Sequence, residues 1–223
     1  MWLFMNETGV KLLKVNEIFD SIEGEGKRAG QLVTFIRLTG CNLRCSYCDT
    51  VYAFREGDML AVPKIVEQVH YHRVTLTGGE PLMQRDVDYL VAALCQHHEV
   101  NIETNGSINI EPFFKFPNVF FTLDYKCGSS LMSPLMLPHN FKCMRKRDVL
   151  KFVVGSMADL EQAKQVYLKY YVNLRNRMIY VSPVFGQIEP AQIVEYIKKN
   201  NLHSWRVQLQ LHKFIWDPNK RGV

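Results

Sequence analysis

Three cysteines lie within one short segment, in the spacing C-x3-C-x2-C: Cys41, Cys45 and Cys48. Thiols this close in sequence can converge on a single metal site, but they can form at most one disulfide among themselves. Thiolates select zinc or iron–sulfur clusters. The remaining cysteines stand alone, with no C-x2-C partner: Cys95, Cys127 and Cys143. The segment therefore predicts a metal centre with thiolate ligands.

The number of thiols in the segment bears on the kind of metal centre. Structural zinc takes four ligands, and either His70 or His72 would be available to complete such a site, so this alternative stays open. An iron–sulfur cluster with four irons is usually held by four cysteines. Three would leave one iron with an open position, and open positions are where metals carry out chemistry. We therefore expect an incomplete cluster that binds a substrate or cofactor directly.

The apolar pattern alternates between segments typical of strands and segments typical of helices. Runs rich in β-branched and aromatic residues predict strands at Val15–Ile22, Leu32–Leu38, Arg73–Thr77, Val100–Thr104, Asn118–Tyr125, Val149–Val154, Met178–Val184 and Val207–Leu211. Helical spacing predicts helices at Val62–His70, at Asp86–His98, from a capping box at Ser156 to about Tyr171, and at Glu189–Asn200. A glycine-rich turn joins the first two strands, which predicts a β-hairpin.

Strands that alternate with helices imply a parallel sheet with helices packed outside it. The roughly six βα units are fewer than the eight of a closed barrel. We therefore expect the α/β class, with an incomplete (β/α)6-type, TIM-like barrel and an N-terminal β-hairpin extension, in a single domain over residues 1–223. Residues 127–147 show no periodicity and contain Pro134 and Pro138, which predicts a mobile loop or lid.

Residues capable of chemistry follow the ends of several expected strands. The three cysteines follow the strand that ends at Leu38, and a glycine pair follows Thr77. Polar groups accompany the next two strand ends: Glu103 and Asn105, then Asp124 and Lys126. Ligands bind at the carboxyl ends of the strands in barrels and in open parallel sheets. We therefore expect these groups to converge on one edge of the sheet.

The composition is that of an ordinary globular protein, with 47% hydrophobic and 22% charged residues, and it excludes a disordered chain. The net charge is +5, but lysine and arginine are spread along the sequence. Nucleic-acid binding needs them gathered on one face, so we expect no nucleic-acid partner, whereas an anionic small substrate fits the charge. No apolar run approaches the roughly 18 residues of a membrane-spanning helix, and no signal peptide is evident. We expect a cytoplasmic protein with no membrane partner.

Two motifs together resemble the signature of the radical S-adenosylmethionine (radical SAM) superfamily. One is the cysteine motif with an aromatic residue, Tyr47, before its third cysteine, and the other is Thr77-Gly78-Gly79-Glu80-Pro81. The resemblance implies that S-adenosylmethionine chelates the open iron of a 4Fe-4S cluster and is cleaved to methionine and a 5′-deoxyadenosyl radical, which takes hydrogen from the substrate. It also implies that the second motif binds the amino group of the methionyl moiety.

Further segments resemble the 7-carboxy-7-deazaguanine synthase family: Phe19–Gly26, Phe35–Leu38, Cys48–Thr50, Arg206–Lys213 and Asn219–Val223. The resemblance runs from about residue 15 to the C-terminus. It implies a lyase that converts 6-carboxy-5,6,7,8-tetrahydropterin to 7-carboxy-7-deazaguanine, with ring contraction and loss of ammonia, on the route to queuosine and related 7-deazapurines. The cofactors that it implies are a 4Fe-4S cluster, S-adenosyl-L-methionine and Mg²⁺.

The resemblance also implies roles for individual residues. Those expected to bind the pterin substrate are Ile22, Glu23, Gly24, Arg37 and Thr77, with His212 on the last expected strand as a further candidate. Those expected to bind S-adenosylmethionine are Gly79, Glu80, Asp124, Tyr125 and Lys126, with Glu103 and Asn105 supplying polar groups at the neighbouring strand end. Cys41, Cys45 and Cys48 are the expected ligands of the cluster, and Thr50 is expected to bind Mg²⁺.

Simpler roles remain open for several of these residues. Arg37 suits a substrate carboxylate because a guanidinium pairs well with one, but a surface ion pair would also explain it. Thr50 also fits a helix cap, Asn105 an ordinary Asn-Gly turn, and His212 a structural histidine. Many relatives have Gln where Glu23 stands, so the pterin contact at this position departs from the family pattern.

The family resemblance further implies a homodimer and an electron donor such as flavodoxin or ferredoxin. Two other functions are compatible with the cysteine motif. One is an activase that uses the same cluster to take hydrogen from a glycine of a partner protein. Such activases normally lack the Glu23–Gly26 turn and Arg37 in this arrangement. The other is a zinc-stabilised basic module that binds RNA, with an affinity that falls steeply with salt.

Overall fold

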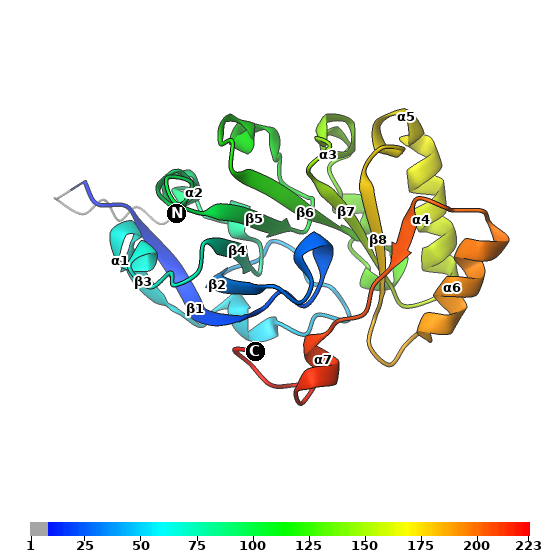
Figure 1. Cartoon of the computed structure of the whole chain (residues 1–223), viewed down its shortest axis with the longest axis horizontal. Helices are drawn as coiled ribbons and strands as arrows, with labels where there is room; N and C mark the ends of the chain where they lie inside the picture. Colours follow the sequence, from blue (N-terminus) through cyan, green and yellow to red (C-terminus); the bar gives the residue numbers. More distant parts are fainter. Residues whose placement is uncertain (1–8) are drawn as a thin grey trace.

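Residues 9–223 are described by the computed structural model, and in this part of the chain a sheet of nine strands forms the body of the fold (Figure 1). The strand order is β3-β1-β2-β4-β5-β6-β7-β8-β9. The strands are β1 (Leu12–Ile22), β2 (Leu32–Leu38), β3 (Asp58–Ala61), β4 (Arg73–Gly78), β5 (Glu99–Thr104), β6 (Val119–Lys126), β7 (Val149–Val154), β8 (Met178–Pro183) and β9 (Trp205–Val207). The α-helices are α1 (Val62–Val66), α2 (Val87–Leu94), α3 (Pro138–Cys143), α4 (Met157–Lys169), α5 (Tyr171–Leu174), α6 (Pro190–Lys199) and α7 (His212–Ile215). Short 3₁₀ helices lie at Gly26–Arg28, Val51–Phe54, Pro81–Met83, Glu111–Lys115, Gly128–Ser130 and Ser133–Leu135.

The directions of the strands divide the sheet into two parts. β1 runs antiparallel to β2 and to β3, whereas each neighbouring pair from β2 to β9 is parallel. The connecting helices α2, α4 and α6 pack against β5, β7 and β8, respectively. Figure 1 shows the parallel strands fanned into an open curve with the helices outside it. The expected α/β class is confirmed, and so is the incomplete barrel with an N-terminal hairpin.

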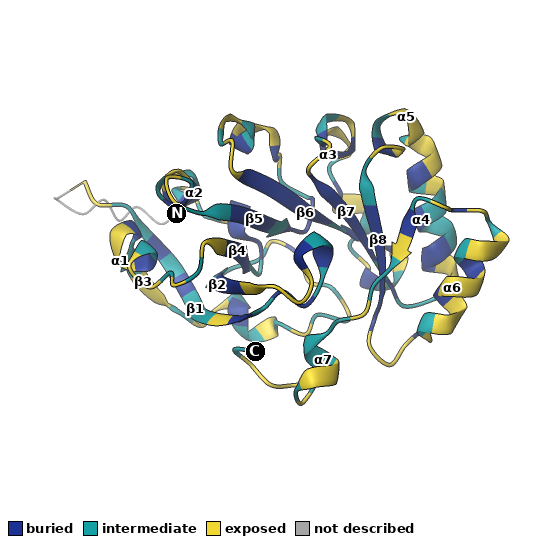
Figure 2. Ribbon diagram, viewed as in Figure 1, coloured by how far each residue is buried: buried dark blue, intermediate teal, exposed yellow. Residues whose placement is uncertain are grey.

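The parallel strands are apolar along most of their length because both of their faces are covered. In β7 the exposed fraction of Val149 and Phe152 is 0%, and Lys151 is the charged exception in an otherwise apolar strand. Figure 2 shows buried residues concentrated in the central strands and exposed residues on the outer faces of the helices. Helix α4 begins at the expected N-cap, since the side chain of Ser156 accepts a hydrogen bond from the Asp159 N–H. The Asp159 carboxylate accepts from the Gly155 and Ser129 N–H groups instead of completing a capping box. Within residues 9–223, no helix combines the length and the apolarity needed to cross a bilayer.

The end of the sheet differs from the sequence-based expectation. The strand expected at Val207–Leu211 is wrong, because β9 covers Trp205–Val207 and the chain then leaves the sheet. His212 consequently begins α7 and does not lie on a strand. The Gln208 N–H still donates to the Val181 carbonyl oxygen on β8 at 3.0 Å. Beyond it the chain follows the hairpin turn, because the Gln208 side chain binds the Gly26 backbone and the Leu211 N–H donates to the Gly24 carbonyl oxygen. β3 was not expected, because it is short and pairs with β1 at the edge of the sheet.

Residues 127–147 contain more regular structure than their sequence predicts. Two 3₁₀ helices and α3 lie in this segment, and the side chain of Asn140 is buried within it. Asn140 Nδ2 donates to the carbonyl oxygens of Gly106 and Ile108 at 3.0 and 2.8 Å, and Asn140 Oδ1 accepts from the Ile110 N–H at 3.2 Å. Such contacts order the segment without the regular spacing of apolar residues by which helices and strands are predicted from a sequence. Movement of the segment as a lid stays a prediction.

Hydrogen bonds join the hairpin turn between β1 and β2 to the segment after β9. The Gly26 N–H donates to Gln208 Oε1 at 2.7 Å, and Gln208 Nε2 donates to the Gly26 carbonyl oxygen at 3.0 Å. The Leu211 N–H donates to the Gly24 carbonyl oxygen at 3.1 Å. The hairpin turn is therefore bonded to the segment after β9, although β1 and β2 do not pair with β9 in the sheet.

We expect the substitution Gln208→Ala to lower the free energy of unfolding by about 1–3 kcal/mol, because it leaves the backbone groups of the buried Gly26 without their partners. Urea denaturation followed by circular dichroism measures this change. Gln165→Ala on the exposed face of α4 is the matched control and should change the free energy by less than about 0.5 kcal/mol. A Gln208→Ala variant as stable as the control would show that the turn is held by other contacts.

Candidate active site

Two adjoining cavities open at the carboxyl ends of the parallel strands. The first, of about 470 Å³, is lined by the cysteine loop after β2, by the ends of β4, β5 and β6, and by part of β7. The second, of about 340 Å³, is lined by the turn after β1, by part of β2 and by residues 218–223. Glu25, Arg37, Thr50 and Glu103 line both cavities. The strand ends that were expected to converge therefore do so.

Cys41, Cys45 and Cys48 are free thiols on the wall of the first cavity. The Leu43 N–H donates to Cys41 Sγ at 3.4 Å, and Asn105 Nδ2 lies 3.9 Å from the same sulfur. Burial raises the pKa of the Cys41 and Cys45 thiols. Donors directed at a sulfur atom favour its thiolate, which is the form that binds metals. All three predicted ligands thus face one cavity.

Neither histidine considered as the fourth ligand of a zinc site lines the cavity that holds the thiols. Across the described residues, no group of three or more His, Cys, Asp and Glu side chains is gathered closely enough to hold one ion. A 4Fe-4S cluster binds each thiolate at a different iron, so its ligands need not meet at one point. His70 instead contacts Asp20 at 2.6 Å, and His72 Nδ1 contacts the His97 carbonyl oxygen at 2.9 Å. The zinc site that His70 or His72 would complete is therefore not formed in the described chain.

The glycine pair after β4 allows the cysteine loop to lie directly against the strand end. The Gly79 N–H donates to the Leu38 carbonyl oxygen at 3.2 Å. A Cβ at Gly78 would overlap that same oxygen, and a Cβ at Gly79 would overlap the Gly40 carbonyl oxygen and lie 2.6 Å from Cys41 Cβ. Neither position has room for a side chain, which is the physical reason for two glycines here.

The carboxylate of Glu80 is turned into the protein and lines neither cavity. Its exposed fraction is 0%, and it accepts hydrogen bonds from the Leu82 N–H at 3.0 Å, the Thr104 hydroxyl at 2.9 Å and the Asn105 N–H at 2.7 Å. Burial raises the pKa of Glu80 to about 7, although these hydrogen bonds act in the opposite direction. The structure does not bring this predicted ligand of S-adenosylmethionine to the cavity surface. Glu80 instead joins the turn after β4 to the end of β5.

Alternation along β6 separates the three residues that were predicted to bind S-adenosylmethionine there. Asp124 and Lys126 line the first cavity, and Lys126 Nζ lies 2.9 Å from Asp124 Oδ2. Tyr125 faces the other side of the sheet, because successive side chains of a strand point in opposite directions. Its ring packs against Phe141 and Phe152, with centroids 5.7 and 5.4 Å apart. The side chain of Tyr125 is thus part of the core.

Glu103 and Asn105 line the first cavity at the end of β5. Asn105 Oδ1 accepts from the Ser107 N–H at 2.9 Å, which is the local turn that an Asn-Gly pair predicts. Asn105 Nδ2 also donates to Asn42 Oδ1 at 3.1 Å. Asn105 therefore forms the predicted turn and also contacts the cysteine loop at the cavity wall, and its contact with S-adenosylmethionine stays a prediction.

Four of the residues predicted to bind the pterin line the second cavity: Ile22, Glu23, Gly24 and Arg37. Thr77 lines the first cavity instead. Arg37 Nε donates to Glu17 Oε1 at 2.7 Å, and the Tyr52 hydroxyl donates to the same oxygen at 3.0 Å. Arg37 makes an ion pair, as the simpler interpretation predicts, but this pair holds the guanidinium at the wall that the two cavities share.

Glu23 is almost fully buried, with an exposed fraction of 2%. Its Oε2 accepts from the Thr75 hydroxyl at 2.5 Å and from Arg28 Nη2 at 3.4 Å. Burial and the charge of Glu103 raise the pKa of Glu23 to about 7, against the effect of Arg28. Near neutral pH the carboxyl group therefore exists partly in its protonated form. A protonated carboxyl can donate a hydrogen bond as the amide of Gln does.

Thr50 lines both cavities, next to an acidic residue that was not among the predicted ligands. Thr50 Oγ1 donates to Asp49 Oδ1 at 2.9 Å, and Asp49 Oδ2 lies 3.3 Å from Lys213 Nζ. The side chain of Thr50 does not cap the 3₁₀ helix Val51–Phe54 that follows it. Oxygen donors of this kind suit Mg²⁺, a hard cation.

His212 lines both cavities from the start of α7. Its ring lies close to the hairpin turn, since a Cβ at Gly24 would be 2.5 Å from His212 Nδ1. Burial lowers the pKa of His212, which favours the neutral ring. The residue therefore reaches the expected wall, although from a helix.

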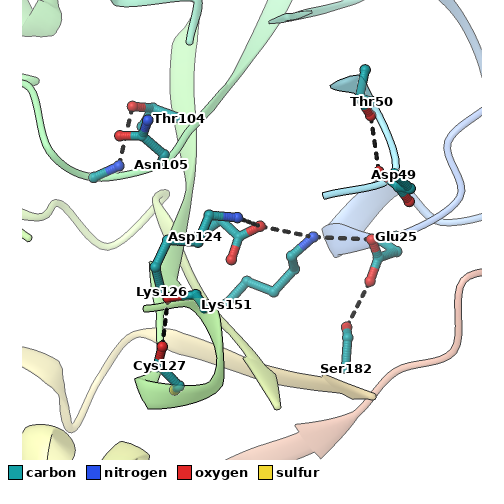
Figure 3. A network of polar contacts seen from close by, with 12 residues as sticks. Glu25, Asp49, Thr50, Thr104, Asn105, Asp124, Lys126, Cys127, Lys151 and Ser182 are labelled. Atoms are coloured by element: carbon teal, nitrogen blue, oxygen red, sulfur yellow. Dashed lines mark hydrogen bonds and ion pairs between the residues drawn. The ribbon is translucent and has the colours of Figure 1, made fainter. Parts of the chain in front are cut away.

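Glu25 and Lys151 were not predicted, and they form an ion pair at the wall of the first cavity. Lys151 Nζ lies 2.9 Å from Glu25 Oε2, and their side chains are 9% and 11% exposed. Figure 3 shows Lys151 extended between Glu25 and Asp124. A lysine within the apolar segment Val149–Val154 was the available signal in the sequence, since Lys is almost never buried unless it is paired.

We expect Gly79→Ala to lower both the iron content and the stability of the protein, because the added methyl group forces the turn away from Cys41. Overpacking of this kind costs about 1–3 kcal/mol. Iron and sulfide analysis after anaerobic reconstitution, together with thermal unfolding, measures both effects. Gln165→Ala on the exposed face of α4 is the control for stability. Gly186→Ala is the control for iron content alone, because no atom lies within 4 Å of its added Cβ but its φ of +76° strains any alanine. Full cluster content in Gly79→Ala would mean that the close contact with Cys41 is unnecessary.

Comparison with known proteins agrees with this geometry. Residues 35–145 match the Radical SAM superfamily. The chain is 44% identical over 220 residues to the 7-carboxy-7-deazaguanine synthase of Clostridium acetobutylicum, and the match covers 94% of this chain and 99% of that protein. It is 38% identical over 218 residues to the protein of the same name from Chlorobaculum tepidum, covering 95% of this chain and 97% of that protein.

The fold is also similar to a solved structure, the crystal structure of QueE from Escherichia coli. The TM-score is 0.70, and the superposition covers 89% of this chain and 94% of that chain. The two sequences are 22% identical, so this likeness supports the fold alone. The sequence matches, which extend over more than nine-tenths of the chain, accompany three free thiols on one cavity wall. The chain therefore belongs to the radical SAM superfamily and, within it, to the 7-carboxy-7-deazaguanine synthase family.

Proposed function

We propose that this protein is a 7-carboxy-7-deazaguanine synthase, a lyase that converts 6-carboxy-5,6,7,8-tetrahydropterin to 7-carboxy-7-deazaguanine with loss of ammonia. The observation that carries the proposal is the pair of adjoining cavities, one walled by three free thiols and the other by Arg37 and the turn after β1. Membership of the family supports the same reaction. The product lies on the route to queuosine and related 7-deazapurines.

The first cavity fits a 4Fe-4S cluster and S-adenosylmethionine. Cys41, Cys45 and Cys48 would hold three irons and leave the fourth for S-adenosylmethionine. When bound, these cofactors supply a 5′-deoxyadenosyl radical by reductive cleavage of S-adenosylmethionine. Asp124 and Lys126 offer a carboxylate and an ammonium group on the same wall, which suit the charged and polar groups of that cofactor. The protein's part is to orient the reactants and to exclude water.

The second cavity fits the pterin. The guanidinium of Arg37, held by Glu17, is a partner for the substrate carboxylate. Glu23 offers a hydrogen bond to the polar edge of the pterin, and its raised pKa lets it act as donor or acceptor near neutral pH. His212, whose lowered pKa favours the neutral ring, offers one nitrogen donor and one acceptor.

Mg²⁺, a reductant and a partner subunit complete the proposal. Thr50 supplies a protein oxygen for Mg²⁺, and substrate and water supply the others, as is usual for this ion. The electron donor is a small redox protein such as flavodoxin or ferredoxin, and the enzyme is a cytoplasmic homodimer. The family resemblance supports each of these assignments.

An anaerobic assay tests the proposed reaction. Reconstituted protein incubated with the carboxytetrahydropterin, S-adenosylmethionine, Mg²⁺ and a reductant should form 7-carboxy-7-deazaguanine, detected by absorbance and mass. Iron and sulfide should be about four each per chain. Cys45→Ala should lose both the cluster and all turnover. Cleavage of S-adenosylmethionine without any deazapurine would point to the activase, and a colourless protein with one tightly held zinc would point to the RNA-binding module.

Arg37→Lys should weaken binding of the carboxytetrahydropterin by about 10- to 150-fold, the range that corresponds to a hydrogen bond to a charged group worth about 1.5–3 kcal/mol. The physical reason is that an ammonium group cannot pair with a carboxylate through two parallel hydrogen bonds. Calorimetric titration measures the affinity. Tetrahydropterin without the carboxylate is the matched ligand, and the wild-type protein and the variant should bind it equally. An equal loss for both ligands would mean that Arg37 does not recognise the carboxylate.

A further inference from the structure

We infer that Lys151 is a positioning residue that fixes the pterin-binding turn against the wall that binds S-adenosylmethionine, so that cofactor cleavage is coupled to conversion of the pterin. The inference rests on the proposed function, and it assigns a role to an ion pair that the reaction as described above does not use. Lys151 lies on β7, Glu25 on the turn after β1 and Asp124 at the end of β6 (Figure 3).

The ammonium group of Lys151 lies between two carboxylates from different walls of the site. Lys151 Nζ is 2.9 Å from Glu25 Oε2 and 3.6 Å from Asp124 Oδ2. Asp124 has a second cation, since Lys126 Nζ is 2.9 Å from the same oxygen. Glu25 forms its ion pair with Lys151, so its negative charge is compensated by this lysine. Loss of Lys151 should therefore affect the turn more than the end of β6.

The carboxylate of Glu25 attaches the hairpin turn to three other segments of the chain. Its Oε1 accepts a hydrogen bond from the Ser182 hydroxyl at 2.6 Å, and its Oε2 contacts Gln210 Nε2 at 3.5 Å in addition to Lys151. Strands β7 and β8 and the segment after β9 thus all hold this one carboxylate. Because Glu25 directly follows Glu23 and Gly24, its position sets the position of residues that line the second cavity.

The ion pair between Lys151 and Glu25 is largely shielded from solvent, so its loss should affect the position of the turn. The side chains of Lys151 and Glu25 are 9% and 11% exposed, so solvent screens the pair much less than it would a surface pair. Without the ammonium group, Glu25 and Asp124 become two carboxylates in one cavity with a missing counter-charge between them. Glu25 then keeps only neutral partners, Ser182 and Gln210. Its uncompensated charge favours a move toward water, which shifts the hairpin turn within the limits set by the backbone bonds of Gly24 and Gly26. Reacting atoms need to be placed within a few tenths of an ångström, so a small shift of the turn is enough to separate radical formation from reaction of the pterin.

The test compares Lys151→Met, a neutral side chain of similar length, with the wild-type holoenzyme. We expect the dissociation constant for the carboxytetrahydropterin, measured by calorimetry, to rise about tenfold, which corresponds to 1.4 kcal/mol. The amount of 5′-deoxyadenosine formed for each deazaguanine product should rise by a similar factor.

Two further variants separate positioning from loss of folding. Lys198→Met removes an exposed lysine that pairs with Glu195 on α6 and should behave as wild type in every measurement. Glu25→Gln should raise the same product ratio, and Lys151→Met added to Glu25→Gln should change it by less than about twofold, since both act through one contact. If Lys151→Met does not fold, Glu25→Gln alone must show the rise in the product ratio.

The outcomes distinguish the inference from the function on which it rests. A wild-type enzyme that cleaves S-adenosylmethionine without forming deazaguanine would overturn the proposed function. A wild-type enzyme that forms the product, with a Lys151→Met variant that keeps both the pterin affinity and the product ratio, would overturn the inference alone. Fully additive effects of Lys151→Met and Glu25→Gln would also overturn it, because Lys151 would then not act through Glu25.

Discussion

The candidate site depends on the close approach of the backbone at the ends of β2 and β4. Leu38 and Gly78 are paired in the parallel register of these strands, and the two chains then turn into the cysteine loop and the glycine turn. The Gly79 N–H donates to the Leu38 carbonyl oxygen at 3.2 Å, and the Glu80 N–H donates to the Gly40 carbonyl oxygen at 2.8 Å. These two hydrogen bonds fix the glycine turn to the start of the cysteine loop. Any side chain on the glycines would separate them. The cysteine loop, and with it the thiols, is therefore positioned by direct backbone contact between the ends of β2 and β4.

Alternating charges organise the rest of the site. Starting from Lys126, the polar chain passes through Asp124, Lys151 and Glu25, and reaches Ser182 on β8. Both carboxylates in this series, Asp124 and Glu25, have a lysine beside them. Ions removed from water need such partners to remain charged. The same chain of contacts crosses from the wall of one cavity to the wall of the other, so the two cavities form one connected unit.

The local features of the site could be predicted from the sequence, and the contacts between distant segments could not. The cysteine spacing, the glycine pair and the strand ends are short-range patterns, and they predicted one converging edge. The inward turn of Glu80 depends on donors from β5, and the pairing of Lys151 with Glu25 joins residues 126 positions apart in the chain. The last strand ends earlier than predicted because Gln208 and Leu211 bind the hairpin turn at Gly26 and Gly24, and no local pattern reveals these contacts. Tyr125 differs from these, since alternation along β6 was sufficient to place its side chain in the core.

The hydrogen bonds between Gly26 and Gln208 join residues 182 positions apart, and this separation has a consequence for biosynthesis. The ribosome completes the cysteine loop and the glycine turn long before it adds Gln208, because domains are made and begin to fold from the N-terminus. Contacts between such distant residues are the slowest to form. The turn that lines the second cavity therefore gains this partner only once residue 208 has been added, after every strand from β1 to β9 has been synthesised.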